Sequence, residues 1–339
     1  MRYKPFGNSG LIVSELCLGT MIFGEDSKRT TSPDQAEKII HHYLDVGGNH
    51  IDTANVYAGG RSEEIVGKAI QARRDQVVLA TKVRFAMGDG PNDQGLSRHH
   101  IIRSVEDSLR RLKTDYIDLL YMHCWDPVTP LEESLNAFND LVRQGKIRYI
   151  GESNFKAWQL MKALALSDAN GWARFIAAQY QYSLVVRDIE DEFVDLCLSE
   201  GVGITPWGPL GGGFLSGKYR SDQRPESPDE GRLATTPDQD EEAWTRRATD
   251  KNWQILEVIE GVIADHPETT HSQVALSWLI AQPGVDSIVL GVRTLEQLQD
   301  NLGAADMQLT EAQLDNLDKA SLTAKGYPYR FLELYGSRN

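Results

Sequence analysis

Four polar side chains in the first part of the chain could together move a proton. They are Asp52, Tyr57, Lys82 and His123. Each stands at or near the end of a short apolar segment of the kind that forms a β-strand. The carboxyl ends of the strands in an eight-stranded parallel barrel all meet at one face, so residues far apart in sequence can converge there. An acid, a phenol, an amine and an imidazole at one place form a proton-transfer site.

The phenol of Tyr57 is the natural proton donor of this set, but a tyrosine has a pKa near ~10. A neighbouring ammonium stabilises the phenolate, so we expect Lys82 to lower the pKa of Tyr57. Asp52 could hold Lys82 charged and oriented, and His123 could hydrogen-bond a substrate oxygen. The set suits protonation of a carbonyl oxygen while a hydride reaches the carbonyl carbon. Any one of these residues alone would more often serve in capping or packing, and their order on successive strands strengthens the catalytic interpretation.

Short apolar segments alternate with longer amphipathic stretches along most of the chain. The predicted strands are 16–19, 50–52, 77–81, 117–121, 149–151, 175–179, 203–206 and 287–290. The predicted helices are 32–46, 62–73, 97–112, 130–144, 156–166, 189–200, a long stretch over 243–282, and 295–304. Strict alternation indicates a parallel sheet, and eight such units close a barrel. The expected fold class is therefore α/β, a (β/α)8 TIM barrel.

Three segments fall outside this repeat. Residues 2–13 read as a β-hairpin with an Asn-Ser-Gly turn, which could plug the amino-terminal end of the barrel. Residues 220–242 form a polar, acidic, proline-containing excursion after the seventh strand, and loops of that length are often lids or disordered segments. Residues 310–339 are expected to form a final helix and a tail. No shift of composition marks a boundary, so we expect one barrel domain over 1–339.

Composition narrows the class of protein. The 339 residues carry a formal net charge of −14 and show no sustained basic stripe, which argues against nucleic acid and anionic membranes as partners. Three scattered cysteines fit a reducing cytosol better than a disulfide framework. The first residues lack the apolar core of a signal peptide, and no apolar run approaches the ~20 residues of a spanning helix. We expect a cytoplasmic protein with a small-molecule substrate; monomer and homo-oligomer stay open.

A second group of polar residues follows the fifth and sixth predicted strands. Ser153 and Asn154 come after the fifth strand, and Gln179 closes the sixth. Their hydroxyl and amide groups match the donors and acceptors of a carboxamide such as that of nicotinamide. The alternative, turn chemistry and a cross-strand bond, is about equally supported by these residues alone.

The loops after the last two strands suit a phosphate-bearing aromatic ligand. Trp207 offers a flat face for stacking, and the glycines of 211–213 let backbone amides approach a pyrophosphate, to which Lys218 could add charge. Arg293 and Thr294 stand at the start of the last barrel helix, where an anion is favoured. A flexible turn and a solvated helix start are the plainer interpretations.

Taken together, these motifs resemble the aldo-keto reductase superfamily from about residue 3 to residue 302, closer to its bacterial and potassium-channel β-subunit branches. The motifs that carry the resemblance are 47–57 (GGNHIDTANVY), 81–82 (TK), 121–123 (YMH), 151–155 (GESNF) and 293–301 (RTLEQLQDN). The resemblance implies a barrel with an amino-terminal hairpin, NADPH bound across its mouth without a Rossmann domain, and no metal. NADH is the less favoured cofactor. Arg293 and Thr294 are a departure, because they stand where many members place Lys-Ser, and they keep one basic residue there. Glu152 departs from the apolar residue that is common at its position.

The resemblance also implies a role for each site residue. Tyr57 is the general acid–base, Asp52 and Lys82 tune it, and His123 orients the carbonyl. The implied cofactor contacts are Gly19, Thr20, Met21, Asp52, Ser153, Asn154, Gln179, Trp207, Gly208, Pro209, Leu210, Gly211, Gly213, Lys218, Gly291, Arg293, Gln297 and Asn301. The expected substrate pocket comprises Phe23, Tyr57, Phe85, His123 and Trp125, with Met21, Ile22 and the tail near 327–335 as further lining.

Three other functions stay open at this point. A cofactor-sensing regulatory subunit would share the same fold and site. A Schiff-base enzyme would use Lys82 as nucleophile, but that amine should then lie in an apolar pocket rather than beside Asp52. A metal-dependent hydrolase would need a His-x-His pair on its first strand, and this sequence has none there.

Overall fold

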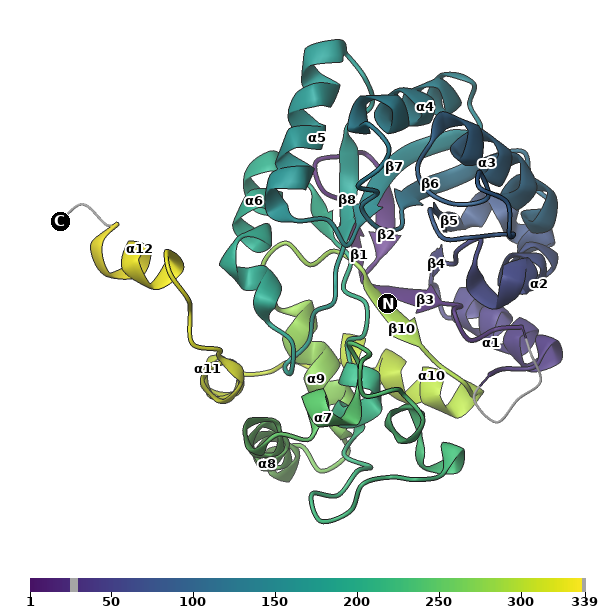
Figure 1. The fold of residues 1–339 in the computed structure, drawn as a ribbon. Coiled ribbons are helices and arrows are strands. Elements are labelled where there is room, and N and C mark those ends of the chain that lie inside the picture. Colours follow the sequence, from purple (N-terminus) through teal and green to yellow (C-terminus); the bar gives the residue numbers. More distant parts are fainter. Residues whose placement is uncertain (25–29, 337–339) are drawn as a thin grey trace.

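The computed structural model describes residues 1–24 and 30–336 and has eight parallel strands in one curved sheet (Figure 1). The strands are β3 (Leu16–Gly19), β4 (His50–Asp52), β5 (Val78–Val83), β6 (Ile117–Met122), β7 (Ile147–Ser153), β8 (Phe175–Gln179), β9 (Gly203–Ile204) and β10 (Ile288–Gly291). Their spatial order is β10-β3-β4-β5-β6-β7-β8-β9. Hydrogen bonds from Ile204 N to Gly284 O (2.8 Å) and from Val289 N to Pro206 O (2.9 Å) close the circle. The predicted (β/α)8 barrel is confirmed.

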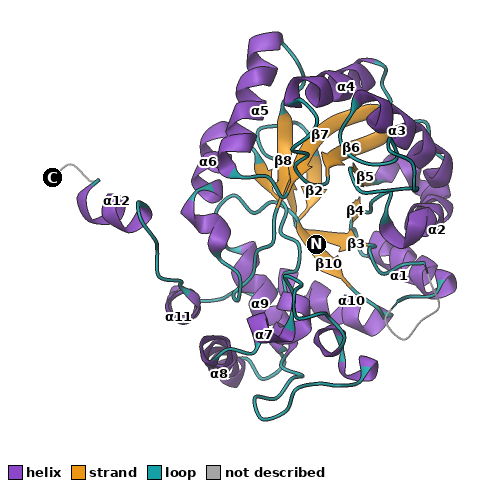
Figure 2. Cartoon of the chain, in the orientation of Figure 1, coloured by secondary structure: helices purple, strands orange, loops and turns teal. Residues whose placement is uncertain are grey.

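Helices surround the strands on the outside (Figure 2). The helices of the repeat are α1 (Pro33–Asp45), α2 (Arg61–Ile70), α3 (Arg98–Leu112), α4 (Leu131–Arg143), α5 (Ala157–Asn170), α6 (Phe193–Glu200), α9 (His271–Ile280) and α10 (Leu295–Leu302). A large core of buried aliphatic and aromatic side chains fills the layer between strands and helices. A smaller cluster inside the barrel includes Val78, Ala80, Leu119 and Ala177. Burial of both strand faces explains why the strands read as continuous apolar runs.

The long helical stretch predicted over 243–282 is wrong as a single element. It consists of α7 (Trp244–Arg247), α8 (Asp250–Asp265) and α9. Thr249 and Thr270 cap α8 and α9 by accepting hydrogen bonds from backbone N–H groups of their first turns. Pro267 stands between the two helices, and its missing N–H cannot continue a helical ladder.

The amino-terminal hairpin closes the end of the barrel where the strands begin. Strands β1 (Tyr3–Pro5) and β2 (Ile12–Ser14) pair antiparallel, as predicted. Phe6, in the connection, is fully buried in the cluster inside the barrel, and its ring lies 5.5 Å from that of His50. Asp286 accepts a hydrogen bond from the backbone N–H of Gly7 (2.8 Å), which ties the turn to the β9–β10 side.

The segment after the barrel has two parts with different packing. Helix α11 (Glu311–Ser321) packs against α8, and Leu317 is fully buried. Helix α12 (Tyr329–Tyr335) instead projects away from the barrel (Figure 1). Tyr327 is 83% exposed and Tyr335 is 69% exposed. These exposed positions do not place the tail near 327–335 at the pocket, and its expected lining role stays a prediction. Within the described residues, no helix has the length and apolar character needed to cross a membrane.

Candidate active site

Lys82 is the centre of a buried polar cluster inside the mouth of the barrel. Its ammonium donates to Asp52 Oδ1, to the carbonyl oxygen of Thr53 (3.0 Å) and to the hydroxyl of Tyr57 (3.2 Å). Lys82 is 1% exposed and Asp52 is 2% exposed. The parallel register, which pairs Asp52 with Ala80, sets the end of β4 beside that of β5. Three of the four residues predicted from their strand-end positions are thus in direct contact.

The charge on Lys82 is held in place by these partners. Burial alone would lower its pKa, but Asp52 and Tyr57 outweigh burial and raise it. A lysine nucleophile needs a depressed pKa, so this environment opposes the Schiff-base alternative.

Tyr57 begins a tight turn, Tyr57–Gly60, that follows β4, and its phenol points at the Lys82 ammonium. Ala58 adopts a left-handed backbone (φ 48°) within this turn. Burial raises the pKa of Tyr57 and outweighs the lowering by Lys82, so the net shift is upward. The expected net lowering is wrong, because loss of water around the phenol costs the phenolate more than one ammonium already paired with Asp52 restores. The phenol therefore keeps its proton at neutral pH.

His123 follows β6 and lies against Tyr57 and Phe85. The ring centroids are 5.8 Å from Tyr57 and 4.7 Å from Phe85, both edge-on. Burial lowers the pKa of His123 well below its usual range, and the charges of Lys82 and Arg84 add to the effect. The imidazole is therefore neutral. Its Nδ1 is buried and has no hydrogen-bond partner among the residues described here.

The residues predicted to hold a carboxamide lie beside this cluster and are bonded to it. Gln179 Nε2 donates to Asp52 Oδ2 (2.9 Å), and Ser153 Oγ donates to the carbonyl oxygen of Gln179 (2.8 Å). Asn154 Nδ2 donates to Ser153 Oγ (2.9 Å) and to the carbonyl oxygen of His123 (3.0 Å). The tertiary structure brings the two predicted groups together, so a ligand held by one would meet the other.

The loop after β9 contains a tryptophan and a run of three glycines. Trp207 is half-buried, and its indole Nε1 has no hydrogen-bond partner in the described part of the chain. Gly211, Gly212 and Gly213 all have positive φ (57°, 69° and 88°), a run that side chains would strain. The N–H of Gly211 donates to the carbonyl oxygen of Gly208 (2.9 Å) and that of Gly213 to the carbonyl oxygen of Leu210 (3.0 Å), so the run forms a tight turn.

Lys218 lies at this glycine run, and Arg293, from another loop, is near enough for its charge to act on Lys218. A Cβ on Gly213 would lie 3.1 Å from the Lys218 ammonium. Burial lowers the pKa of Lys218, and the charge of Arg293 lowers it further, so the two cations share one locality. Arg293 precedes α10, where Thr294 caps the helix and Gln297 accepts from the Arg293 N–H (2.8 Å). This is the kind of place that an anionic group would occupy.

The other residues predicted to contact the cofactor differ in how deeply they are buried. Thr20 is buried, and its hydroxyl contacts the Asp52 carbonyl (3.0 Å) and the Ser62 hydroxyl (2.8 Å), so it supports the strand ends. Gly291 and Gln297 are exposed, whereas Asn301 is buried. Of the remaining predicted contacts, Gly19 ends β3, and Met21, Gly208, Pro209 and Leu210 lie in the loops after β3 and β9.

The predicted substrate pocket is partly corrected. Phe85 and Trp125 are half-buried near His123, and the Trp125 ring packs 5.2 Å from that of Phe155. Phe23 is fully buried in the core behind the strands. Its inclusion in the pocket is wrong, because a side chain with no exposed surface, packed among core residues, does not line a pocket. Met21, in that turn, is 42% exposed.

Two residues near the mouth were missed by the sequence interpretation. Arg232, in the polar excursion 220–242, pairs with Glu242 (2.6 Å). Its positive charge acts to lower the pKa of Tyr57. Leu233 in the same excursion lies 2.9 Å from where a Cβ on Gly212 would stand, so this segment packs onto the glycine run. Arg84 lies just past the end of β5. Its spacing of two residues from Lys82 was an available signal, because alternate residues of a strand face the same side.

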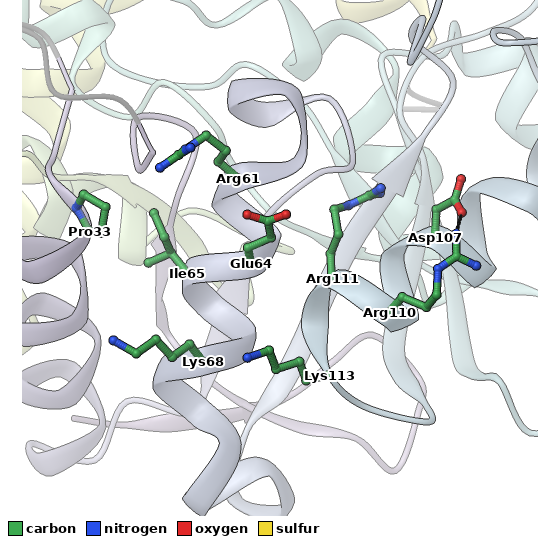
Figure 3. Close-up of a pocket in the computed structure, with 9 residues that line it drawn as sticks. All are labelled: Pro33, Arg61, Glu64, Ile65, Lys68, Asp107, Arg110, Arg111 and Lys113. Carbon is green, nitrogen blue, oxygen red and sulfur yellow. Dashed lines mark hydrogen bonds and ion pairs between the residues drawn. The ribbon is translucent and has the colours of Figure 1, made fainter.

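A separate groove lies on the outer surface between α1, α2 and α3, with a volume of about 510 Å³ (Figure 3). Its cations are largely neutralised by neighbours: Arg110 pairs with Asp107, Lys68 with Glu37 and Arg111 with Glu63. It holds none of the predicted site residues. Among residues 1–24 and 30–336, no three His, Cys, Asp or Glu side chains are grouped to hold a metal ion.

Known proteins are similar in sequence to this chain over almost its whole length. The sequence model of the Aldo/keto reductase family matches residues 15–322. The chain is 36% identical over 328 residues to a probable voltage-gated potassium channel subunit beta of Arabidopsis thaliana, covering 94% of this chain and 96% of that protein. It is 38% identical over 325 residues to the uncharacterized oxidoreductase YrpG of Bacillus subtilis (strain 168), covering 91% and 92%. It is 32% identical over 337 residues to an aryl-alcohol dehydrogenase (NADP+) of Phanerodontia chrysosporium, covering 94% and 86%. This protein therefore belongs to the aldo/keto reductase family, whose members act on small carbonyl compounds.

Proposed function

We propose that this protein reduces the carbonyl group of a small aldehyde or ketone to an alcohol, with hydride from NADPH and a proton from Tyr57. The observation that carries the proposal is the buried Lys82 ammonium, which contacts both the Asp52 carboxylate and the Tyr57 hydroxyl. A charged lysine in that position stabilises the phenolate that remains after the proton leaves.

The residues of the mouth divide the work of proton transfer. A substrate oxygen beside Tyr57 and His123 would receive hydrogen bonds from both, so charge developing on it is stabilised where it appears. The neutral His123 ring adds a donor without a second full charge. Tyr57, protonated at neutral pH, supplies the proton, and Lys82 with Asp52 compensates its loss.

Several features fit a nicotinamide dinucleotide phosphate, which supplies the hydride when bound. Ser153, Asn154 and Gln179 would hold its carboxamide. The half-buried ring of Trp207, whose Nε1 has no partner among the described residues, would stack on its nicotinamide. The glycine run with Lys218 and Arg293 would receive its phosphates. Two cations at one locality, and a relative named for NADP+, support NADPH over NADH.

The substitution Tyr57→Phe tests this proposal. It removes the proton donor and keeps the ring. We therefore expect kcat for aldehyde reduction to fall by about 10²- to 10⁴-fold while NADPH still binds. Turnover is followed as loss of NADPH absorbance with a panel of aldehydes and ketones, and binding as NADPH fluorescence. Tyr116→Phe is the matched control, because Tyr116 lies between α3 and β6, outside the cluster. A near-normal rate in Tyr57→Phe would remove Tyr57 from the mechanism.

A second candidate is a cofactor-binding regulatory subunit. It is favoured by the 36% identity to a protein named as a potassium channel subunit beta. Tight NADPH binding without turnover of any carbonyl compound would favour this function over the first.

The scattered cysteines and the acidic surface charge support a place in the reducing cytosol. The packing of hairpin and α11 onto the barrel supports a single domain.

A further inference from the structure

Arg84 is positioned at the mouth of the barrel, beside the candidate proton-transfer site. It is half-buried and follows Val83, the last residue of β5, two positions after Lys82. Alternate residues of an extended segment face the same side, so Arg84 lies on the side of Lys82 and one step nearer the solvent. The Val83 carbonyl accepts from the His123 N–H (3.0 Å), which aligns the neighbouring strand end with Arg84.

The Arg84 guanidinium has no ion pair or hydrogen bond with any described residue, and its Nε is buried without a partner. Three other partly or fully buried arginines have ion pairs: Arg187 with Glu190, Arg111 with Glu63 and Arg74 with Asp118. Arg247 also has a buried Nε without a described partner, but unlike Arg84 it donates through Nη2 to the carbonyl oxygen of Glu241 (2.9 Å). A buried charged group without a partner is costly, so it persists in a fold only where something else meets it.

The carboxylate of Asp126 is close enough for the charge of Arg84 to act on it, but other donors bind it. Both oxygens of Asp126 accept hydrogen bonds, from Leu96 N (2.7 Å), Val128 N (3.0 Å) and Thr129 Oγ1 (2.7 Å). Asp126 therefore serves to hold the loop between β6 and α4 and leaves the guanidinium of Arg84 available.

A single aromatic ring separates Arg84 from the imidazole. The Arg84 guanidinium lies 5.3 Å from the centroid of Phe85, and that centroid lies 4.7 Å from the ring of His123. A ligand whose carbonyl meets His123 could thus pass along Phe85 and place its other end at Arg84. The guanidinium fork is suited to a carboxylate or phosphate, which it binds through two parallel hydrogen bonds.

We propose that Arg84 binds an anionic group of the substrate, so that this protein prefers aldehydes carrying a carboxylate or phosphate at a short distance from the carbonyl. The inference rests on the proposed carbonyl reduction and names its substrate class.

Matched pairs of substrates test the preference. The pairs are succinic semialdehyde with butanal, 4-carboxybenzaldehyde with 4-methylbenzaldehyde, and glyceraldehyde 3-phosphate with glyceraldehyde. We expect kcat/KM of wild type to be at least about tenfold higher for the charged member of one or more pairs, and the pair concerned distinguishes carboxylate from phosphate.

Variants assign the preference to Arg84. Arg84→Met should lower kcat/KM for the charged member about 10- to 100-fold, mainly through KM, and leave the neutral member unchanged. Arg84→Lys should keep part of the kcat/KM for the charged member, because lysine supplies the positive charge without the planar guanidinium. Arg148→Met, an exposed arginine near the start of β7, is the control and should change neither. Equal losses for charged and neutral substrates, or no preference in wild type, would overturn the proposal.

A binding measurement separates this inference from the proposed function. Calorimetric titration of NADP+-loaded protein with 4-hydroxybutyrate, 4-methylbenzoate and glycerol 3-phosphate needs no turnover. Binding that is lost in Arg84→Met supports the anion site even if no carbonyl compound is reduced. Absence of binding to wild type together with reduction of neutral aldehydes would reject the anion site and leave the reductase standing.

Discussion

At the scale of single residues, the site separates satisfied polar groups from open ones. The inner groups are saturated: Lys82 uses its three donors, and the two oxygens of Asp52 accept from Lys82 and Gln179. Toward the mouth, His123 Nδ1, Arg84 Nε and Trp207 Nε1 lack partners within the described residues. Buried polar atoms are nearly always paired, so these three atoms are candidates for contacts with a ligand. Unpartnered buried atoms are not confined to the mouth, because His50 Nε2, the Asn55 amide and Glu152 Oε2 also lack described partners.

Glu152 carries a residue-scale prediction about stability. It is fully buried on β7, accepts a hydrogen bond from the Tyr180 hydroxyl through Oε1, and leaves Oε2 without a partner in the described chain. Burial raises its pKa from 4.5 to about 8, so the folded state holds a proton that the unfolded state releases above pH 4.5. Its contribution is therefore favourable at low pH and is lost as pH rises from about 4.5 through about 8.

We expect Glu152→Gln to remove this loss of stability at high pH, because glutamine has no proton to release. Relative to wild type, its unfolding free energy should be similar near pH 5 and higher by ~3–5 kcal/mol at pH 9, measured by urea unfolding across that range. Glu257→Gln, at an exposed position on α8, is the control and should run parallel to wild type. If the curves of Glu152→Gln and wild type are also parallel, the carboxyl is not held protonated by burial.

At the scale of elements, the two ends of the barrel have different tasks. The carboxyl ends of the strands carry the polar cluster, and the hairpin β1–β2 closes the other end with Phe6 and Val13 inside. In α/β barrels the active site lies at the carboxyl ends of the strands. The end closed by the hairpin is therefore expected to affect stability alone.

Phe6→Ala tests this division of the barrel. Loss of a fully buried ring should lower the unfolding free energy by about 3–5 kcal/mol, because neighbouring side chains fill the cavity only in part. The affinity for NADPH, measured by fluorescence in the absence of denaturant, should stay unchanged. Ile12→Ala, at a position 48% exposed in the same hairpin, should cost less than about 1 kcal/mol. A loss of NADPH affinity in a folded Phe6→Ala protein would show that the two ends are coupled.

At the scale of the whole molecule, the carboxyl-terminal tail is attached to the barrel by few contacts. Tyr329 donates to Glu192 (2.7 Å), and Lys325 pairs with Glu333 inside the tail itself (2.6 Å). Helix α11 is different, since Asp318 accepts from the indole of Trp278 (3.0 Å) and Leu317 is buried.

Removal of residues 324–339 should therefore change the unfolding free energy by less than about 1 kcal/mol, the scale of exposed contacts. Reduction of small aldehydes should persist at the wild-type rate. A longer truncation that removes residues 311–339 should destabilise the protein strongly, because it uncovers the core beside α8. Denaturant titration and the NADPH assay measure both effects, and loss of activity in the shorter truncation alone would place the tail at the site.

The sequence by itself determined the barrel and the cluster at its centre. Strand runs, turn residues and caps are local signals, and parallel strands must share one end, so Asp52, Tyr57 and Lys82 could be expected to meet. Local pattern did not resolve the break at Pro267, because the apolar period of α8 resumes in α9 after a few residues.

Only the tertiary structure decided how each of these groups is solvated and paired. The net direction of the Tyr57 pKa, the burial of Phe23, the exposure of α12 and the lack of a described partner for Arg84 Nε all depend on which side chains from distant segments surround them. Desolvation and charge pairing act through space, so residue types and spacing locate the chemical groups but leave their environment undetermined.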